Sequence, residues 1–183
     1  EEGGSSVLSP LAHLLKACFM TDSSAAGAAV YSPLTLALYD AWVLGISNRY
    51  AWRCPTQTVL LPFFRANVRP HHLDIGVGTG YYLAKTQLSS QTQITLLDLN
   101  PSSLEAAKRR IARPGTRTIQ HDVFKPIPGD ERFDSISLFY LMHCLPGPLD
   151  AKAAIFGRLK HNLQPGGVLF GATILGDEAA HNG

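Results

Sequence analysis

The chain has 183 residues, of which 45% are hydrophobic and only 16% are charged, and this fits one compact domain with a short extra segment. The formal net charge of +2 excludes a strongly basic surface for nucleic acid or anionic membranes, and no apolar run reaches the roughly 18 residues of a transmembrane helix. Three cysteines without CxxC spacing indicate neither a disulfide framework nor a zinc site, so we expect a cytoplasmic protein.

Residues 1–70 predict an N-terminal helical segment that acts as a cap. Ser32 and Pro33 have the pattern of an N-cap followed by proline at the first helical position. A further helix is expected to begin at Thr56, and Pro62 is expected to kink or stop it.

Residues 71–183 change to short apolar runs that alternate with helical patterns, which is typical of a parallel sheet with βαβ connections. One helix is predicted to begin at Asn100, with Ser102 and Glu105 in the spacing of a capping box, and another covers Leu149–Leu163. The expected strands are His72–Ile75, Ile94–Leu97, Thr116–Gln120, Asp134–Phe139 and Val168–Leu175. We expect this part to be a single cofactor-binding α/β unit.

Three glycines follow the first predicted strand, at Gly76, Gly78 and Gly80. Glycines at such a strand-to-helix turn let a ligand approach the N–H groups at the helix start. A dinucleotide fingerprint requires GxGxxG, whereas the glycines here fall as GxGxG and Tyr81 follows them. Asp74 adds a carboxylate that suits an ammonium group better than a pyrophosphate.

Acidic residues also follow the next two strands. Asp98 ends the second strand about 20 residues after the first glycine, where an acid accepts hydrogen bonds from ribose hydroxyls. Asp122 and Val123 close the third strand, where a carboxylate or a backbone amide could contact an adenine edge; a strand-end Asp also simply caps turns. Because parallel strands end at one crevice, these positions fit a ligand with a ribose, an amine and an adenine.

This ordered set resembles the class I S-adenosylmethionine-dependent methyltransferases of the small-molecule type. The resemblance covers roughly residues 71 to 175, and it is carried by Leu73-Asp74-Ile75-Gly76-Val77-Gly78-Thr79-Gly80, Asp98, Asp122, Phe133-Asp134 through Leu145, and Leu163-Gln164-Pro165-Gly166-Gly167-Val168-Leu169. It implies a Rossmann-like sheet and S-adenosylmethionine as cofactor. Asp74 and the glycine loop would hold the methionine part, Asp98 the ribose, and Asp122 with Val123 the adenine. Leu99 and Tyr140 are further candidate cofactor contacts.

The sequence contains fewer motifs for binding the methyl acceptor than for binding the cofactor. His143 lies just beyond the fourth strand and is the candidate general base, because the ordinary pKa of histidine is near neutrality; a purely structural histidine is the alternative. The candidate acceptor pocket consists of cap residues, for each of which packing is the alternative: Tyr31, Tyr39, Trp52 and Arg53.

The resemblance also implies two further C-terminal strands that the sequence does not contain after Leu175. The segment Val168–Leu175 would then form an apolar edge strand, which proteins usually pair or cover. A second copy of the chain or the N-terminal segment would cover it, so a homo-oligomer is one expectation. A truncated longer protein is the other.

Three functions follow as hypotheses. The first is methyl transfer to a small-molecule acceptor, such as a specialised metabolite. The second is a methyltransferase-fold protein that binds the cofactor or an apolar ligand without methylating, as a cyclase or pericyclase would. The third, an NAD-binding module, is disfavoured by Tyr81 and Asp74.

Overall fold

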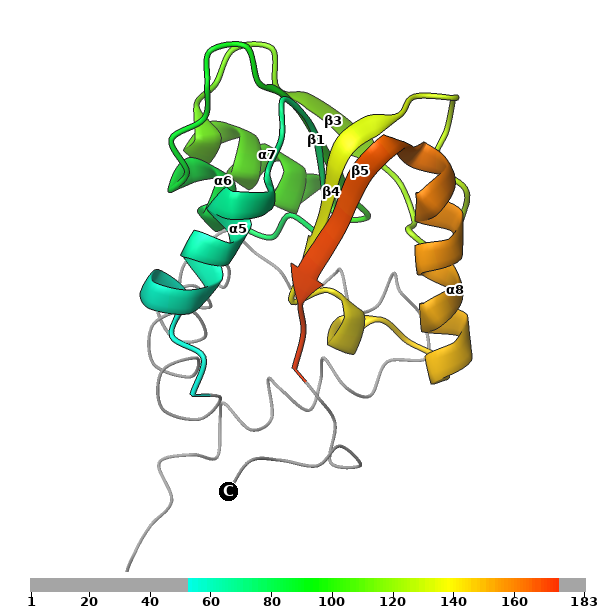
Figure 1. The fold of residues 1–183 in the computed structure, drawn as a ribbon. Helices are drawn as coiled ribbons and strands as arrows, with labels where there is room; N and C mark the ends of the chain where they lie inside the picture. Colours follow the sequence, from blue (N-terminus) through cyan, green and yellow to red (C-terminus); the bar gives the residue numbers. More distant parts are fainter. Residues whose placement is uncertain (1–52, 175–183) are drawn as a thin grey trace, which may run out of the picture.

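The computed structural model describes residues 53–174. Within this range five parallel strands form one sheet that has helices on both faces (Figure 1). This confirms the predicted Rossmann-like α/β fold class. No helix of the described range is long and apolar enough to cross a membrane.

The strand order places β1 in the centre of the sheet, in the sequence β3-β2-β1-β4-β5. The chain runs outward from β1 to β3 and then crosses to the other side, where β4 pairs directly with β1. The strands are β1 (His71–Ile75), β2 (Gln93–Asp98), β3 (Arg117–Gln120), β4 (Phe133–Phe139) and β5 (Leu163–Ala172). In such a sheet, ligands bind at the carboxyl ends of the strands where the order reverses, here between β1 and β4.

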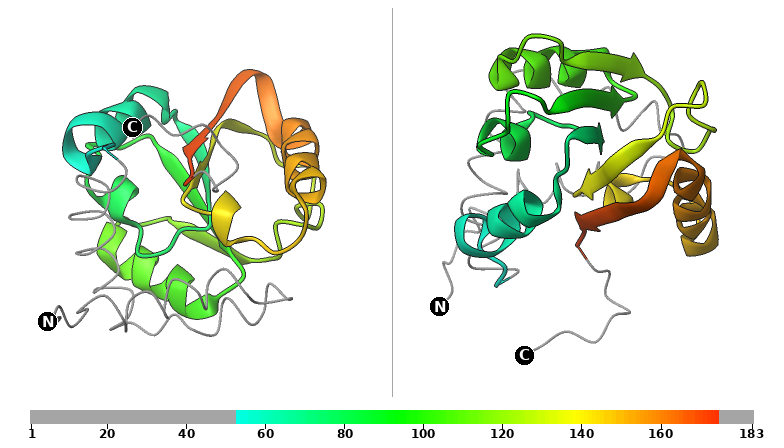
Figure 2. Two further views of the ribbon diagram at one scale, coloured as in Figure 1. Left: turned by 90° about the horizontal axis from the view of Figure 1, so that it is seen from below. Right: turned by 45° about the horizontal axis from the view of Figure 1, so that its top comes forward.

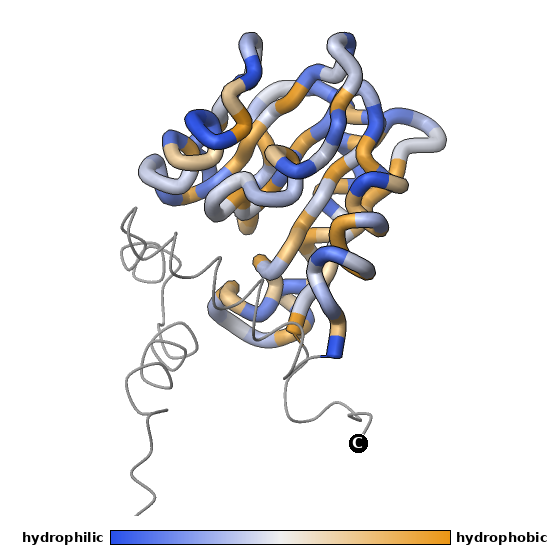
Figure 3. Tube along the Cα trace, turned by 90° about the vertical axis from the view of Figure 1, so that its left-hand side faces the viewer, coloured by the Kyte–Doolittle hydropathy of each residue, from blue (hydrophilic) through white to orange (hydrophobic). Residues whose placement is uncertain are grey.

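The helices divide between the two faces (Figure 2). Helices α5 (Leu61–Asn67), α6 (Tyr81–Ala84) and α7 (Pro101–Ile111) cover one face, called the α5 face below, whose buried cluster includes Phe64, Tyr82, Phe139 and Phe170. Helix α8 (Leu149–Leu159) covers the opposite α8 face, whose cluster includes Leu73, Ile75, Leu97 and Ile136. The hydropathy colouring shows apolar residues along the strands and hydrophilic residues on outer helical turns (Figure 3).

The helix predicted from Thr56 begins at that residue, but Pro62 does not end it. A π-helical turn, Thr56–Leu60, comes first, and α5 follows with Pro62 in its first turn. Proline is tolerated there because the first N–H groups of a helix have no intrahelical acceptor. Of the two expected effects of Pro62, a kink or a stop, the stop was therefore wrong.

One predicted capping motif and two predicted boundaries also differ from the structure. Asn100 is the N-cap of α7, because its side-chain oxygen accepts the Ser102 N–H at 2.9 Å, so the capping box of Ser102 and Glu105 was wrong. Helix α8 ends at Leu159, and a 3-10 turn (Lys160–Asn162) leads into β5. Strand β5 begins earlier than predicted, since Leu163 already pairs with Phe133 across a register irregularity.

Candidate functional site

The loop between β1 and α6 contains three glycines whose surroundings differ. All three have positive φ, at +71° for Gly76, +51° for Gly78 and +69° for Gly80. A Cβ on Gly80 would meet the Ala107 Cα of α7 at 3.0 Å, whereas a Cβ on Gly78 would meet no atom of residues 53–174 within 4 Å. Gly80 therefore packs the loop on α7, and the loop is open at Gly78, where a ligand could approach the backbone.

Asp98 connects the end of β2 to this loop. Its carboxylate accepts the Asn100 N–H at 2.8 Å, and the backbone N–H groups of Gly78, Val77 and Leu99 lie near enough to influence its pKa. Burial raises the pKa of Asp98, and these backbone donors lower it in part. The carboxylate predicted to bind a ribose thus lies near the glycine loop.

Asp74 is the most buried acid of the site, with 6% of its surface exposed. The Ser137 hydroxyl donates to its Oδ1 at 2.5 Å. Burial raises the pKa of Asp74 to about 7, the Ser137 hydrogen bond opposes this rise, and the charge of Asp98 adds to it. Its carboxylate is therefore close to the balance between the neutral and the ionised form at neutral pH.

Asp122 and Val123 follow β3, but their side chains have roles in the fold itself. One Asp122 oxygen accepts the Phe124 N–H at 3.0 Å, which is the turn-capping contact that a strand-end Asp often makes. Val123 is 7% exposed and packs in the cluster of the α8 face. Their proposed contact with an adenine stays a prediction.

Tyr140 and His143 come together just beyond β4. Tyr140 has φ +57° and donates its N–H to the Ala172 carbonyl at 2.7 Å, which keeps β4 and β5 together at their carboxyl ends. His143 lies in a 3-10 turn (Met142–Cys144), its ring 6.0 Å from that of Tyr140 and its Nδ1 3.2 Å from the Thr173 hydroxyl. Burial, with a smaller effect of the Lys152 charge, lowers the pKa of His143 to about 4, so its ring is neutral at pH 7.

The structure gives less information about the roles of the other predicted site residues. Leu99 is half-buried after β2, and its carbonyl accepts the Gln120 side-chain N–H at 3.3 Å. Arg53 is exposed at the start of the described range. The remaining candidate pocket residues lie outside the described residues: Tyr31, Tyr39 and Trp52.

The sequence interpretation missed several residues that support the loop. Ser137 was read only as part of an apolar strand, although the alternation of serines along β4 places them on one face. Arg110 was assigned to a solvated helix face, but it donates to the Thr79 hydroxyl at 2.7 Å and lies 5.1 Å above the Tyr81 ring. Helix α7 therefore holds the glycine loop through a side chain as well as through packing.

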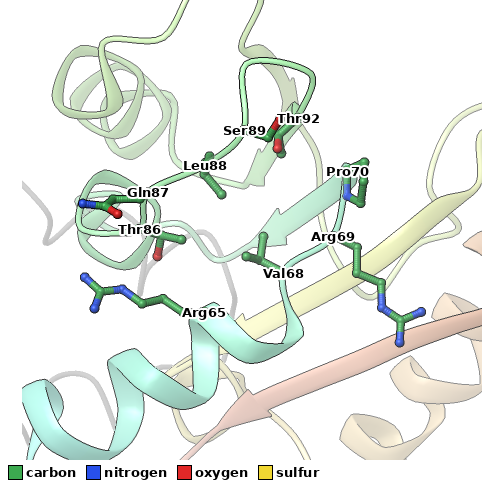
Figure 4. A pocket seen from close by; sticks show the side chains of 9 residues that line it. All are labelled: Arg65, Val68, Arg69, Pro70, Thr86, Gln87, Leu88, Ser89 and Thr92. Carbon is green, nitrogen blue, oxygen red and sulfur yellow. The ribbon is translucent and has the colours of Figure 1, made fainter.

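A cavity of about 490 Å³ lies beside the amino ends of the central strands (Figure 4). It is lined by residues that precede β1 and β2, including Arg65, Arg69 and Thr92. Both guanidinium groups bind backbone carbonyls, Arg65 that of Lys85 at 2.5 Å and Arg69 that of Gly166 at 2.7 Å. This cavity lies at the amino ends of the strands and is separate from the acids and glycines described above.

Comparison with known proteins identifies the family. Residues 73–169 match the methyltransferase domain. The chain belongs to this methyltransferase family. It is 49% identical to the physcion biosynthesis cluster O-methyltransferase of Aspergillus chevalieri over 158 residues, which are 85% of this chain and 71% of that protein. It is 44% identical to the N-methyltransferase vrtF of Penicillium aethiopicum over 162 residues, which are 88% of this chain and 68% of that protein.

The solved structures agree on the fold. The N-methyltransferase NodS from Bradyrhizobium japonicum WM9, in complex with S-adenosyl-L-homocysteine, superimposes with a TM-score of 0.57 at 22% identity. The match covers 73% of this chain and 66% of that one. The chain spans 63 to 71% of the length of three fungal methyltransferases, one of which is compared from two sources of Aspergillus niger.

Proposed function

We propose that this chain binds S-adenosylmethionine and transfers its methyl group to a nucleophilic atom of a small molecule in the cytoplasm. The observation that carries the proposal is the position of the Asp98 carboxylate at the end of β2, near the backbone N–H groups of Val77 and Gly78 that influence its pKa. It joins an acceptor for ribose hydroxyls to a loop that is open at Gly78. The family membership of residues 73–169 supports the same function.

The described residues fit the chemistry of this cofactor. A carboxylate buried beside the loop, Asp74, matches the ammonium group of a methionine part, whereas it would repel the pyrophosphate of a dinucleotide. Asp98 offers oxygens for a diol, and the N–H groups of the glycine loop are donors at a helix start. This combination favours the cofactor over NAD.

The cofactor supplies a methyl group that its sulfonium has already activated for displacement. The protein's tasks are then to align the acceptor with that carbon and to exclude water. His143 is the candidate to take the proton that an acceptor O–H or N–H loses as the new bond forms. Its Nδ1 lies 3.2 Å from the Thr173 hydroxyl, and its ring is neutral at pH 7, which is the form that can take a proton.

The acceptor class is proposed from the relatives. Those compared above are named an O-methyltransferase and an N-methyltransferase, one of them from a biosynthesis cluster. A phenol or an amine of a specialised metabolite is therefore the acceptor that we propose for this chain. A phenol and an amine each lose a proton on methylation, and His143 is the candidate base that accepts it.

Two measurements test the proposal. At a concentration of ~100 times its dissociation constant, S-adenosylhomocysteine should stabilise the folded protein by about 2.7 kcal/mol, and NADH should give no shift. Label should then pass from methyl-labelled S-adenosylmethionine to members of a panel of phenols and amines. Stabilisation without transfer to any of them would favour the non-methylating hypothesis, and stabilisation by NADH alone would favour the dinucleotide module.

The role of His143 has its own test. His143→Ala should lower kcat by about a hundredfold for a phenol acceptor while the affinity for S-adenosylhomocysteine stays unchanged. His161→Ala, on an exposed position after α8, is the matched control. An unchanged kcat and pH profile in His143→Ala would dismiss the base.

A further inference from the structure

A chain of buried polar side chains crosses the otherwise apolar α5 face. His72, Ser135 and Ser137 have no exposed surface, and Asp74 is 6% exposed. The register pairs His72 with Ser135 and Asp74 with Ser137 on the adjacent strands β1 and β4. The four side chains therefore form two neighbouring rungs that lead from the amino ends of the strands toward the site.

Aromatic side chains cover the middle of this chain. The His72 ring lies 5.8 Å from Phe64 at an interplanar angle of 79°, and 6.0 Å from Phe170. A polar ring in such a place is unfavourable unless its nitrogens are paired, and an aliphatic side chain would fill the same space. Both nitrogens of His72 are paired, with Ser135 Oγ at 2.7 Å and with Ser137 Oγ at 3.1 Å.

The hydrogen bonds have one direction that satisfies every member. The Arg69 N–H is a fixed donor to Ser135 Oγ at 2.9 Å, so the Ser135 hydroxyl is able to donate to His72 Nδ1. The ring proton then sits on Nε2 and is donated to Ser137 Oγ, whose own proton goes to Asp74 Oδ1. Each hydroxyl and the ring accept once and donate once, and the chain ends on an ionised carboxylate.

The opposite direction requires a different state of the site. It would place the ring proton on Nδ1, give Ser135 two incoming donors, and require a proton on Asp74 to donate to Ser137. A neutral Asp74 has no charge with which to hold a cationic ammonium group. The direction of the chain and the charge of Asp74 are therefore coupled.

The neighbours of Asp74 place the pKa of its carboxyl where the direction of the hydrogen bonds decides its charge. Burial and the Asp98 charge raise the pKa of Asp74 to about 7, and the Ser137 hydrogen bond is the contribution that lowers it. The titratable groups that concern Asp74 on the strands beside it are His72 and Asp98, and burial keeps His72 neutral by lowering its pKa to about 3. Tyr82 of α6 lies in the cluster of the same face. If Ser137 ceased to donate, the carboxyl would be protonated at the pH where the enzyme has to bind its cofactor.

We propose that His72 is a positioning residue for cofactor binding, which acts by directing the Ser137 hydroxyl onto Asp74. The proposal rests on the proposed function for its ligand, the ammonium group of S-adenosylmethionine. His72 does not touch the cofactor in this account. It sets the orientation of Ser137 and thereby the charge of Asp74.

The test is a titration of the full chain with S-adenosylhomocysteine by calorimetry, between pH 5.5 and 8.5, in wild type, His72→Leu, Ser137→Ala and His72→Gln. In the wild type the affinity should fall as the pH drops through the pKa of Asp74. His72→Leu and Ser137→Ala should move this midpoint upward by about one unit, which weakens binding about tenfold at pH 6.5 and much less at pH 8.5. His72→Gln keeps an N–H donor of similar reach and should restore part of the wild-type profile.

Two control variants separate positioning from general damage. Thr95→Val removes a buried hydroxyl from β2 on the opposite face, where Thr95 pairs with Leu73. Phe170→Leu loosens the aromatic cover of His72 and leaves the hydrogen-bonding groups in place. Either variant lowers stability without moving the pH midpoint. An unchanged midpoint in His72→Leu and Ser137→Ala would overturn the proposal.

NMR on the protein without cofactor gives an independent result. The ¹⁵N shifts of His72 should identify the neutral tautomer with its proton on Nε2, and the ¹³C titration of the Asp74 carboxyl should move upward in both variants. A proton on Nδ1 would overturn the chain. Failure of the wild type to bind S-adenosylhomocysteine would overturn the proposed function and the cofactor role of His72 together, and the carboxyl titration would still decide whether His72 acts on Asp74.

Discussion

The two faces of β1 are equally buried and chemically opposite. On the α8 face Leu73 and Ile75 are 0% and 1% exposed and pack among aliphatic side chains. On the α5 face His72 and Asp74 are 0% and 6% exposed and belong to a hydrogen-bonded chain. One strand thus supports the fold with one side and prepares a binding site with the other.

The difference shows where stability and function compete. Burying a polar group is unfavourable unless the group is hydrogen-bonded, and burying a carboxylate costs more free energy than burying a neutral group. Stability alone would therefore favour aliphatic residues on both faces. The polar face leads to the carboxyl end of β1, where the glycine loop begins. We therefore expect mutations on the α8 face to change stability and mutations on the α5 face of β1 to change binding and its pH dependence.

The largest expected effect on stability comes from the aliphatic face. Leu73→Ala should lower the free energy of unfolding by about 2–5 kcal/mol, because it leaves a cavity among fully buried side chains. Urea denaturation followed by circular dichroism measures this loss. The affinity of the folded variant for S-adenosylhomocysteine should equal that of the wild type. If Leu73→Ala lost more of this affinity than His72→Leu does, the two faces would not differ in the way described.

The next effect concerns the glycine that packs on α7. Gly80→Ala should lower the free energy of unfolding by about 2–3 kcal/mol, because the new Cβ meets Ala107 backbone atoms at 3.0–3.2 Å. Gly129→Ala is the matched control, since Gly129 has φ +83° and, among the residues that the structure describes, no atom within 4 Å of an added Cβ. Equal losses in both variants would show that backbone strain alone, without the contact to α7, explains Gly80.

Asp74→Asn should change stability in a pH-dependent way. Between pH 4 and 7 the folded wild type keeps a proton on Asp74 that the unfolded chain has released, so the wild type loses stability as the pH rises through this window. The amide cannot ionise, so above pH 7 the variant should be more stable than wild type by on the order of 2 kcal/mol. His72 titrates in both proteins and cancels in the difference. Urea unfolding midpoints of wild type and Asp74→Asn should be compared at pH 4.5 and at pH 8. The same difference between the two proteins at both pH values would contradict the raised pKa of Asp74.

The smallest expected effect on stability is at the open glycine. Gly78→Ala should cost only about 1 kcal/mol from its φ of +51°, because no atom of the described part of the chain lies within 4 Å of the added Cβ. The methyl group would occupy the side from which a ligand approaches the loop. Calorimetry should therefore show S-adenosylhomocysteine binding weakened by about tenfold, which is ~1.4 kcal/mol. Unchanged affinity would place the ligand elsewhere on the loop.

Much of the fold follows from local pattern in the sequence. All five strands and the helix after Asn100 were predicted: the three inner strands, β2, β1 and β4, are short buried runs, and helix starts have specific caps. The errors occurred where tertiary contacts decide a boundary. Strand β5 begins at Leu163 because Phe133 pairs with it, and nothing local in the Gln164–Gly167 segment predicts strand.

The site divides in the same way. The glycine loop, Asp74 and Asp98 were predicted because they are close in sequence to strand ends. Ser137 and His72 were missed because their partnership spans 65 residues and depends on the register of β1 against β4. Only the pairing of the two strands shows that polar residues of separate apolar runs meet.

The central claim is that the cofactor lies across the glycine loop and the end of β2, and titration of S-adenosylhomocysteine into wild type and Asp98→Ala tests it most directly. The exposed Asp130→Ala, in the loop before β4, is the control for loss of an acidic side chain. We predict saturable binding to one site in the wild type and in Asp130→Ala, and a loss of at least about a hundredfold in affinity, ~2.7 kcal/mol, in Asp98→Ala. Equal affinity in the wild type and Asp98→Ala, or no binding to the wild type, would contradict the account.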